Sequence, residues 1–418
     1  MQIANRPAAI KAPGTHRSID LPIIEPPRLR TEEEGERPTS WLELFFDLVF
    51  VVAIDQVARR LHDGPDIIAV AGFVVLYGAV WYAWVGYVIY NDRFGTDDLS
   101  DRLLTLAQMG AVTVVAVRAH DAFGEGAPAF ALAYGAFRLV LALRYAIAAV
   151  YIRKVRSLAA RQALGFALAA SIWIVSAGVS GDARYLLWGI GFLVDIATPL
   201  LERGFHRLVP PDPAHLEERF GVFIIIVLGE GFVGLVEGMR ELAWVPGAGV
   251  TVTLALLLGF SLWWVYFETL DAAPIVEVRR GGRIWPYKLW VFGHLPLAAG
   301  IAATGIGVGV AVRHAAKAPL PNGARWLLCG SLACCFAALA LLQIAYAAVG
   351  GDRLRRRLAR RKLLTVVTAL AVGALGGGLS SAAVMGLLTL QGAVLVGLDL
   401  RHRAQLRRTS MGSPRPVS

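Results

Sequence analysis

Long apolar runs recur along the chain from about residue 41 onward, and short polar segments rich in Arg, Asp and Pro separate them. A run of about 18 apolar residues can cross the roughly 30 Å hydrocarbon core of a bilayer as an α-helix. The pattern therefore predicts a series of about twelve transmembrane helices. Their expected positions are residues 41–60, 66–90, 101–119, 128–152, 158–179, 183–201, 216–237, 248–270, 286–312, 324–349, 362–378 and 381–399.

The composition supports an all-α integral membrane protein. Hydrophobic residues make up 56% of the 418 residues and charged residues 17%, which is more apolar surface than a soluble domain could bury. A net charge of +10 would suggest nucleic-acid binding in a soluble chain, but here the basic residues lie in short loops. We therefore attribute the charge to membrane topology and expect no nucleic-acid partner.

Lys and Arg fall mainly on one side of the predicted membrane. Most of the 41 basic residues lie in the two tails and the even-numbered loops, including the run "RLRRRLARRK". The positive-inside rule then predicts that both termini are cytoplasmic and that the number of spans is even. Residues 1–40 have no apolar core of a signal peptide, so we expect a disordered cytoplasmic tail there and a second, basic tail at 401–418.

An internal similarity divides the chain into two halves. A shift of about 174 residues sets "LELFFDLVFVVAI" against "LEERFGVFIIIVL", and weaker matches follow in the next two spans at slightly larger shifts. We predict two tandem six-helix repeats, at 41–207 and 215–400. Because six is even, both repeats would have the same orientation in the membrane.

Carboxylates inside two predicted spans are the main functional clue. Glu43, Asp47 and Asp55 recur at helical spacing in the first span, and Glu230 lies deep in the seventh. An ionised group inside a bilayer is unfavourable by a few kcal/mol or more unless it faces protein or water. Two interpretations stay open: these acids hold helices together, or they line a pathway and bind a cation or proton.

The fourth and ninth spans carry further embedded polar groups. Arg138 and Arg144 need acidic partners, and Asp47, Asp195 and Glu230 are the candidates, although the sequence does not assign the pairs. His294 is either a structural imidazole or a pH-responsive site.

Few residues suggest chemistry other than ion binding. Cys329, Cys334 and Cys335 fall in one apolar span and indicate packing, so no metal site is predicted. The sequence lacks a nucleotide-binding loop, a zinc-protease motif and a nucleophile elbow. We accordingly predict no cofactor and no enzymatic activity.

Gly305 and Gly309 form a G-x-x-x-G pair typical of close helix contact.

Four stretches, "ELFFDLVFVVAI", "HLEERFGVFIIIVLGE", "LWWVYFE" and "GHLPLAAGI", resemble in order and spacing the signatures of the bacterial low temperature requirement A family. The resemblance implies a multi-pass inner-membrane protein whose biochemical activity is not generally established. A fainter likeness, limited to "FFD" and the two-by-six layout, is to the potassium channels of endosomes and lysosomes. Glu268 stands where the family's third motif often has Asp. The residues that match family motifs are Glu43, Phe46, Asp47, His215, Glu218, Arg219, Glu230, Trp263, Trp264, Tyr266, Phe267, His294 and Pro296.

Together these observations predict a channel or secondary transporter for a cation or proton in the bacterial cytoplasmic membrane. Asp47 and Glu230, with Glu43, would bind the ion. Arg138, Arg144 and Asp195 are the candidates for counter-charge, and His294 would make ion binding depend on pH. The alternative is a non-transporting protein that supports envelope function or growth in the cold through lipid or partner binding. Membrane lipids are expected partners in either case, and the oligomeric state is left open.

Overall fold

The computed structural model describes residues 25–29, 39–62, 65–201, 208–240, 246–268, 271–315, 319–350 and 353–411, and within these ranges it contains helices and no strand. Side chains are described up to residue 401 and, in α9, from residue 249. The α-helices are α1 (Trp41–Ala58), α2 (Ile67–Phe94), α3 (Leu99–Arg118), α4 (Ala127–Tyr151), α5 (Arg156–Ser176), α6 (Asp182–Leu201), α8 (Pro213–Arg240), α9 (Pro246–Phe267), α10 (Ala273–Arg279), α11 (Trp285–Arg313), α12 (Asn322–Gly350), α13 (Arg353–Leu375) and α14 (Ser381–Met411). Two short 3-10 helices, η2 (Arg59–Leu61) and η3 (Arg153–Val155), follow α1 and α4.

Polar capping residues determine where several helices begin. Ser40 and Glu43 form a capping box at the start of α1, in which each side chain bonds the other residue's backbone N–H. Asp66 caps α2 by accepting a 2.7 Å hydrogen bond from the Ala69 amide, and Asp98 caps α3 in the same way. These caps satisfy amide groups that a helix end leaves without internal partners.

Nine helices in the described part of the chain are long and apolar enough to cross a membrane. They are α2, α4, α5, α6, α8, α9, α11, α12 and α14. Three further helices, α1, α3 and α13, have 18, 20 and 23 residues but do not meet the same combined measure of length, hydropathy and charge. In α1 the three acids Glu43, Asp47 and Asp55 exceed the charge that this measure allows. The prediction of several membrane-spanning helices is therefore confirmed, whereas the number twelve stays a prediction.

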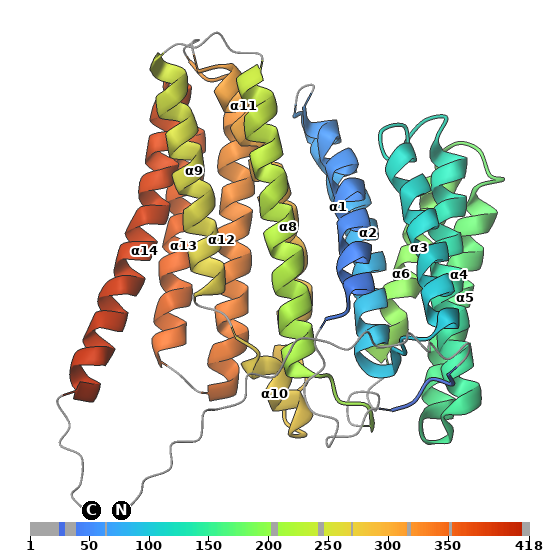
Figure 1. Cartoon of the computed structure of the whole chain (residues 1–418). Coiled ribbons are helices and arrows are strands. Elements are labelled where there is room, and N and C mark those ends of the chain that lie inside the picture. Colours follow the sequence, from blue (N-terminus) through green and yellow to red (C-terminus); the bar gives the residue numbers. More distant parts are fainter. Residues whose placement is uncertain are drawn as a thin grey trace, which may run out of the picture.

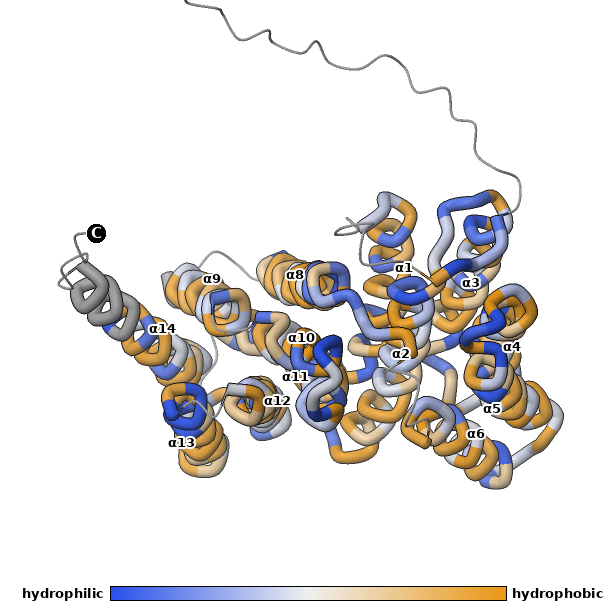
Figure 2. The backbone as a smooth tube through the Cα atoms, turned by 90° about the horizontal axis from the view of Figure 1, so that it is seen from below, coloured by the Kyte–Doolittle hydropathy of each residue, from blue (hydrophilic) through white to orange (hydrophobic). Residues whose placement is uncertain are grey.

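The long helices form two groups that meet at α1, α2, α8 and α11 (Figures 1 and 2). In the first group α1 contacts α2 and α3, and the chain of neighbours continues from α3 through α4 and α5 to α6. In the second group α8 contacts α9 and α11, and the neighbours continue from α11 through α12 and α13 to α14. This shared order of neighbours is the one that two tandem repeats would have, and the repeat itself stays a prediction.

Glycines bring α8 and α11 into close contact. A Cβ atom on Gly238 would lie 2.6 Å from the carbonyl oxygen of Gly309, and one on Gly305 would lie 2.7 Å from the Cα atom of Gly231. Only hydrogen atoms in place of side chains permit this approach between two helix backbones. The G-x-x-x-G pair at Gly305 and Gly309 thus lies in a close helix contact, as its spacing predicts.

The basic run at 353–362 is helical, which corrects the prediction that it is a loop. It forms the first turns of α13, and Figure 2 shows this hydrophilic end of the helix in blue. Arg and Leu have high helix propensity and the run contains no Gly or Pro, so the helix extends outward beyond its apolar part. In the same way α14 continues through residues 401–411 of the predicted basic tail. Most of the predicted tail at 1–40 lies outside the described residues.

Candidate functional site

Asp47 lies on α1 with a side chain that is fully buried between α1, α2 and α8. Its Oδ1 atom accepts one 2.7 Å hydrogen bond from the Trp84 indole N–H and another of 2.7 Å from Nη2 of Arg219. Arg219 is equally buried. Two opposite charges buried together compensate part of each other's desolvation. The second oxygen of Asp47, and Nε and Nη1 of Arg219, have no hydrogen-bond partner among the described residues.

His215 lies between two carboxylates about one helix turn from the Asp47–Arg219 pair, toward the starts of α1 and α8. Nε2 of His215 is 3.3 Å from Oε1 of Glu43, and its Nδ1 is 3.2 Å from Oδ1 of Asp92. The Asp212 amide also donates to Asp92, at 3.3 Å. This arrangement links α1, α2 and α8 through a side chain that can carry a proton on either ring nitrogen.

A second group of charges lies toward the other end of the same two helices. Nε of Arg59 donates a 2.8 Å hydrogen bond to Asp55, and its Nη2 lies 3.4 Å from Oε1 of Glu237 on α8. Glu230 is half-buried about two helix turns before Glu237, within electrostatic reach of Asp55, Arg59 and Glu237. The acids in this group outnumber the arginines.

We call these two charged groups together the α1–α8 seam. Its residues are Glu43, Asp47, Asp55, Arg59, Asp92, His215, Arg219, Glu230 and Glu237. Along both helices, buried apolar side chains occupy the stretch between the two groups. These apolar residues are Phe50, Val51, Ile54, Phe223, Ile224 and Val227. The seam thus has titratable groups at two depths and an apolar band between them.

The two arginines of α4 pair with acids outside the seam. Arg138 forms a fully buried ion pair with Asp195 of α6, and its guanidinium lies 5.1 Å from the Tyr82 ring centroid. Arg144 pairs with Asp101 of α3 and also donates a 2.7 Å hydrogen bond to the Thr105 hydroxyl. Asp195 was one of the three candidate partners. Asp101 was not among them.

His294 is enclosed by aromatic rings and joins α11 to α9. Its Nδ1 lies 2.7 Å from the Trp290 carbonyl oxygen, and its Nε2 lies 3.0 Å from the Tyr266 hydroxyl. A carbonyl only accepts, so Nδ1 carries the hydrogen and Nε2 accepts from Tyr266. Phe220 packs edge-on against the imidazole as well. This fully satisfied geometry supports the structural interpretation of His294.

The other motif residues surround the seam or lie apart from it. Phe46 stacks on Tyr87 with ring centroids 3.6 Å apart, and Glu218 accepts a 3.2 Å hydrogen bond from the Thr39 amide. Trp263 and Trp264 are half-buried on α9 and contact the Phe260 ring. None of these aromatic residues belongs to the seam.

The part of the chain that the structure describes holds no group of three or more His, Cys, Asp or Glu residues arranged to bind a metal ion. Five of the six seam carboxylates lie beside a basic residue: Glu43 and Asp92 beside His215, Asp47 beside Arg219, and Asp55 and Glu237 beside Arg59.

The sequence analysis did not predict Arg219 as the partner of Asp47, and it predicted neither of the two carboxylates beside His215, Glu43 and Asp92. The signal that could have found the first pair is the internal repeat. Asp47 and Arg219 are 172 residues apart, as are Glu43 and His215, and this separation is close to the shift that aligns the two motifs. Helices in corresponding places of two repeats often pack together at the repeat interface.

Comparison with known proteins places this arrangement in a family. Residues 38–397 match the family described as bacterial low temperature requirement A protein (LtrA). The chain is also 27% identical, over 301 residues, to the uncharacterized protein RA0937 of Rhizobium meliloti (strain 1021), an alignment that covers 68% of this chain and 72% of the relative. The match to the family includes α1 to α13 and every residue of the seam. The chain is a multi-pass membrane protein and belongs to the bacterial low temperature requirement A family.

Proposed function

We propose that the protein is a channel or secondary transporter that moves a proton or small cation along the α1–α8 seam in the bacterial cytoplasmic membrane. The observation that carries this proposal is the presence of titratable groups at two depths of the same helix pair. One group contains Glu43, Asp47 and Asp92, and the other contains Asp55, Glu230 and Glu237.

The balance of charge in the seam favours a positive ion. The six carboxylates face Arg59, Arg219 and His215, and His62 and Arg313 lie beside the second group. The charges of these residues sum to a negative value even when both histidines are protonated. Net negative charge at membrane depth is stabilised by a bound cation or by protonation. Asp47 retains one oxygen without a hydrogen-bond partner among the described residues, which is where an ion or proton would bind.

The apolar band between the two groups implies a closed pathway. Phe50, Ile54 and Val227 are fully buried, and a charged species does not cross such a layer unless it opens. Transport would therefore require α1 and α8 to shift relative to each other, so that each charged group faces its own side in turn. Since α1 and α8 belong to different predicted halves, this is a movement of one half against the other.

Flux measurements on reconstituted protein test the proposal. The full-length chain in liposomes, with a pH-sensitive dye inside and a potassium gradient across the bilayer, should show flux that depends on the protein. Asp47→Asn and Glu230→Gln should each reduce it at least ten-fold. Glu218→Gln is the matched control because Glu218 lies on the same helix but outside the seam. Folded protein that gives no flux of either ion at any pH or temperature would overturn the proposal.

The exposed arginines of α13 favour a second candidate function. Arg353, Arg356, Arg357 and Arg360 are exposed on the first turns of this helix, where they can bind anionic lipid or an acidic partner. A protein that supports cold growth in this way would need these charges and not Glu230. Growth in the cold of cells carrying Glu230→Gln, or Gln at all four arginines, distinguishes the two functions.

A further inference from the structure

A cavity outside the seam lies between α2, α11 and α12, and its volume is about 380 Å³. At about 10–15 Å³ for each group the size of a water molecule, this is room for at least about 25 heavy atoms, enough for one long hydrocarbon chain. The helix α2 belongs to the first predicted half of the chain, whereas α11 and α12 belong to the second. None of the lining residues belongs to the seam, so the cavity is a separate feature of the contact between the halves.

The wall of the cavity is apolar. The apolar lining residues are Leu61, Pro65, Ile67, Val70, Phe73, Val74, Ala299, Gly300, Ala303, Trp326, Leu327 and Gly330. Asp66 is the one charged residue among the described lining residues, and it caps the start of α2 by accepting a hydrogen bond from the Ala69 amide. Ligand sites with such walls bind apolar molecules.

The polar side chains in the wall are already hydrogen-bonded within the protein. The Ser331 hydroxyl donates a 3.2 Å hydrogen bond to the Leu328 carbonyl and accepts one of 2.9 Å from Thr304. The Cys334 thiol donates to the Pro296 carbonyl at 3.4 Å. A buried water molecule normally makes about three hydrogen bonds to polar groups that lack other partners. Such a wall therefore favours neither water nor a ligand with buried polar atoms.

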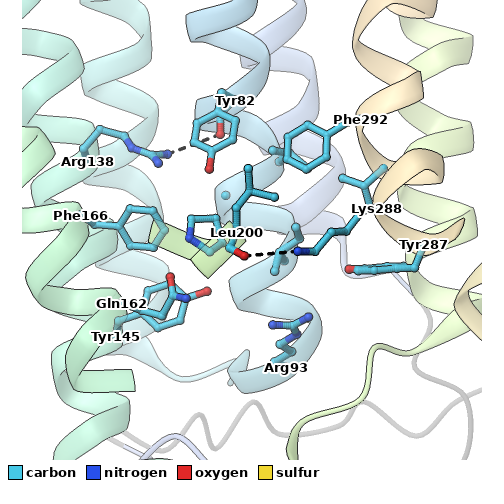
Figure 3. Close-up of a pocket in the computed structure, with 15 residues that line it drawn as sticks. Tyr82, Arg93, Arg138, Tyr145, Gln162, Phe166, Leu200, Tyr287, Lys288 and Phe292 are labelled. Carbon is cyan, nitrogen blue, oxygen red and sulfur yellow. Dashed lines mark hydrogen bonds between the residues drawn. The ribbon is translucent and has the colours of Figure 1, made fainter. Parts of the chain in front are cut away.

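The smaller pocket in Figure 3 differs in the chemistry of its wall. Its volume is about 60 Å³, and Arg138 and Lys288 line it. Each donates a hydrogen bond to a backbone carbonyl oxygen, Arg138 to Tyr82 at 3.4 Å and Lys288 to Leu200 at 3.3 Å. No basic residue is among the described residues that line the cavity between α2, α11 and α12. An uncharged occupant therefore fits the larger cavity.

The cavity opens toward the surface that lipid covers. Ile67, Val74 and Trp326 line it and are 81%, 57% and 42% exposed on helices that are long and apolar enough to cross a membrane. Trp326 lies in the second turn of α12, and Trp is frequent where a membrane meets water. From Trp326 to Cys334 the wall follows α12 for about 12 Å at roughly 1.5 Å per residue. This length is close to half of the roughly 30 Å hydrocarbon core, the depth of one leaflet.

Gly330 marks a place on α12 where helix packing leaves space. A Cβ atom on Gly330 would meet nothing within 4 Å, whereas one on Gly300 of α11 would lie 2.7 Å from Sγ of Cys335. The atoms around an empty space lose the dispersion contacts that a packed neighbour would supply. An apolar chain in the cavity restores these contacts.

We propose that this cavity binds one acyl chain of a membrane phospholipid. The chain enters beside Val74 and extends along α12 toward Cys334, while the glycerol and the headgroup stay at the level of Trp326, outside the cavity. Binding would therefore depend on the chain and not on the charge of the headgroup. The lipid would fill the contact between α2 of one half and α11 and α12 of the other.

Photochemical crosslinking of the full-length protein in liposomes tests the site. A phospholipid with a diazirine near the end of one acyl chain should label peptides that contain the lining residues of α2 and α12 more than peptides of α6. Gly330→Leu and Ala303→Leu should each reduce this labelling about ten-fold, because a side chain that fills the cavity leaves no room for the chain. Native mass spectrometry in non-ionic detergent should show one retained phospholipid fewer for both variants. Phosphatidylglycerol and phosphatidylcholine with the same chains should be retained alike.

Gly189→Leu is the matched control. Gly189 is exposed on α6, and a Cβ atom there also meets nothing within 4 Å, so leucine at this position should leave labelling and retention unchanged. Wild-type labelling that is no stronger at the cavity than on α6 would overturn the proposal, even if the cavity variants fail to fold. Equal retention by wild type and both cavity variants would overturn it as well. Retention of a free fatty acid in place of a phospholipid would overturn the assignment of the ligand. Each readout is independent of ion flux, so this site and the seam can fail separately.

Discussion

At the scale of single residues, the protein buries charge in pairs rather than singly. Asp47 with Arg219 and Arg138 with Asp195 are fully buried pairs, each contributed by two different helices. Such a pair is a weak source of net stability, but the loss of one member leaves an uncompensated charge in a low-dielectric interior. The two members of each pair should therefore depend on each other.

The Asp47–Arg219 pair gives a direct test of this dependence. Arg219→Met should lower the free energy of unfolding by about 3–5 kcal/mol, because it leaves the Asp47 carboxylate buried without its counter-charge. The double variant Asp47→Asn with Arg219→Met should recover much of the loss. The measurement is the thermal midpoint of each variant in the same detergent. Equal midpoints for the single and double variants would mean that the two charges are not coupled.

Residue chemistry in the sequence predicted that buried charges exist but predicted only some of their partners. Asp195 was a candidate for Arg138 because both lie within apolar spans. Asp101 was missed because residues at the start of a span are normally hydrated, and Arg144 reaches it only because α3 and α4 pack side by side. Which charged residues form a pair depends on how far each helix is shifted along its axis and how it is rotated. Neither can be derived from the hydropathy of the sequence.

At the scale of helices, close packing follows from small side chains on facing surfaces. The contact of α8 with α11 uses Gly231, Gly234 and Gly238 on one helix and Gly305 and Gly309 on the other. No hydrophobic effect drives two helices together inside lipid, so van der Waals contact between backbones has to supply the attraction. Their spacing was visible in the sequence, whereas the pairing of these two helices became apparent only in the structure.

Alanine at these glycines should push the two helices apart. Gly309→Ala and Gly238→Ala each place a methyl group less than 3 Å from a backbone carbonyl oxygen, so each should lower stability by about 1–3 kcal/mol. Gly229→Ala is the control, because a Cβ atom there meets nothing within 4 Å and alanine favours the helix. Thermal midpoints compare the three variants. A control that destabilises as much as the other two would point to a general loss of helix flexibility.

At the scale of the whole molecule, hydropathy predicted the multi-pass helical architecture well, since each crossing needs a long apolar helix. The positions of α2, α4 and α12 agree closely with the predicted spans. The number of crossings is harder to predict, because it depends on helices whose apolar part is short. The side of the membrane on which the C-terminus lies depends on whether α13 crosses. This helix is the uncertain one because its first turns are rich in arginine.

The apolar part of α13, residues 363–375, is about 20 Å long at roughly 1.5 Å per residue, shorter than the roughly 30 Å core it would cross. Two features of the structure make a crossing feasible. Lys362 is buried and faces the charge of Asp399 on α14, and Nε of Arg325 donates a 2.9 Å hydrogen bond to the Gly373 carbonyl near the end of α13. Long basic side chains can also extend toward the headgroups. We therefore expect α13 to cross the membrane.

Single cysteines at the two ends of α13 decide this point. With Cys329, Cys334 and Cys335 replaced by Ala, Gly378→Cys should react with a membrane-impermeant maleimide on intact cells, whereas Arg360→Cys should react only after permeabilisation. Glu125→Cys, between α3 and α4, is the control for the outer side, because the predicted topology places that loop opposite the basic loops. If positions 360 and 378 are labelled from the same side, α13 does not cross and the number of spans is odd. The end of α14 would then lie opposite the start of α1, and the two halves could not be equivalent six-helix repeats.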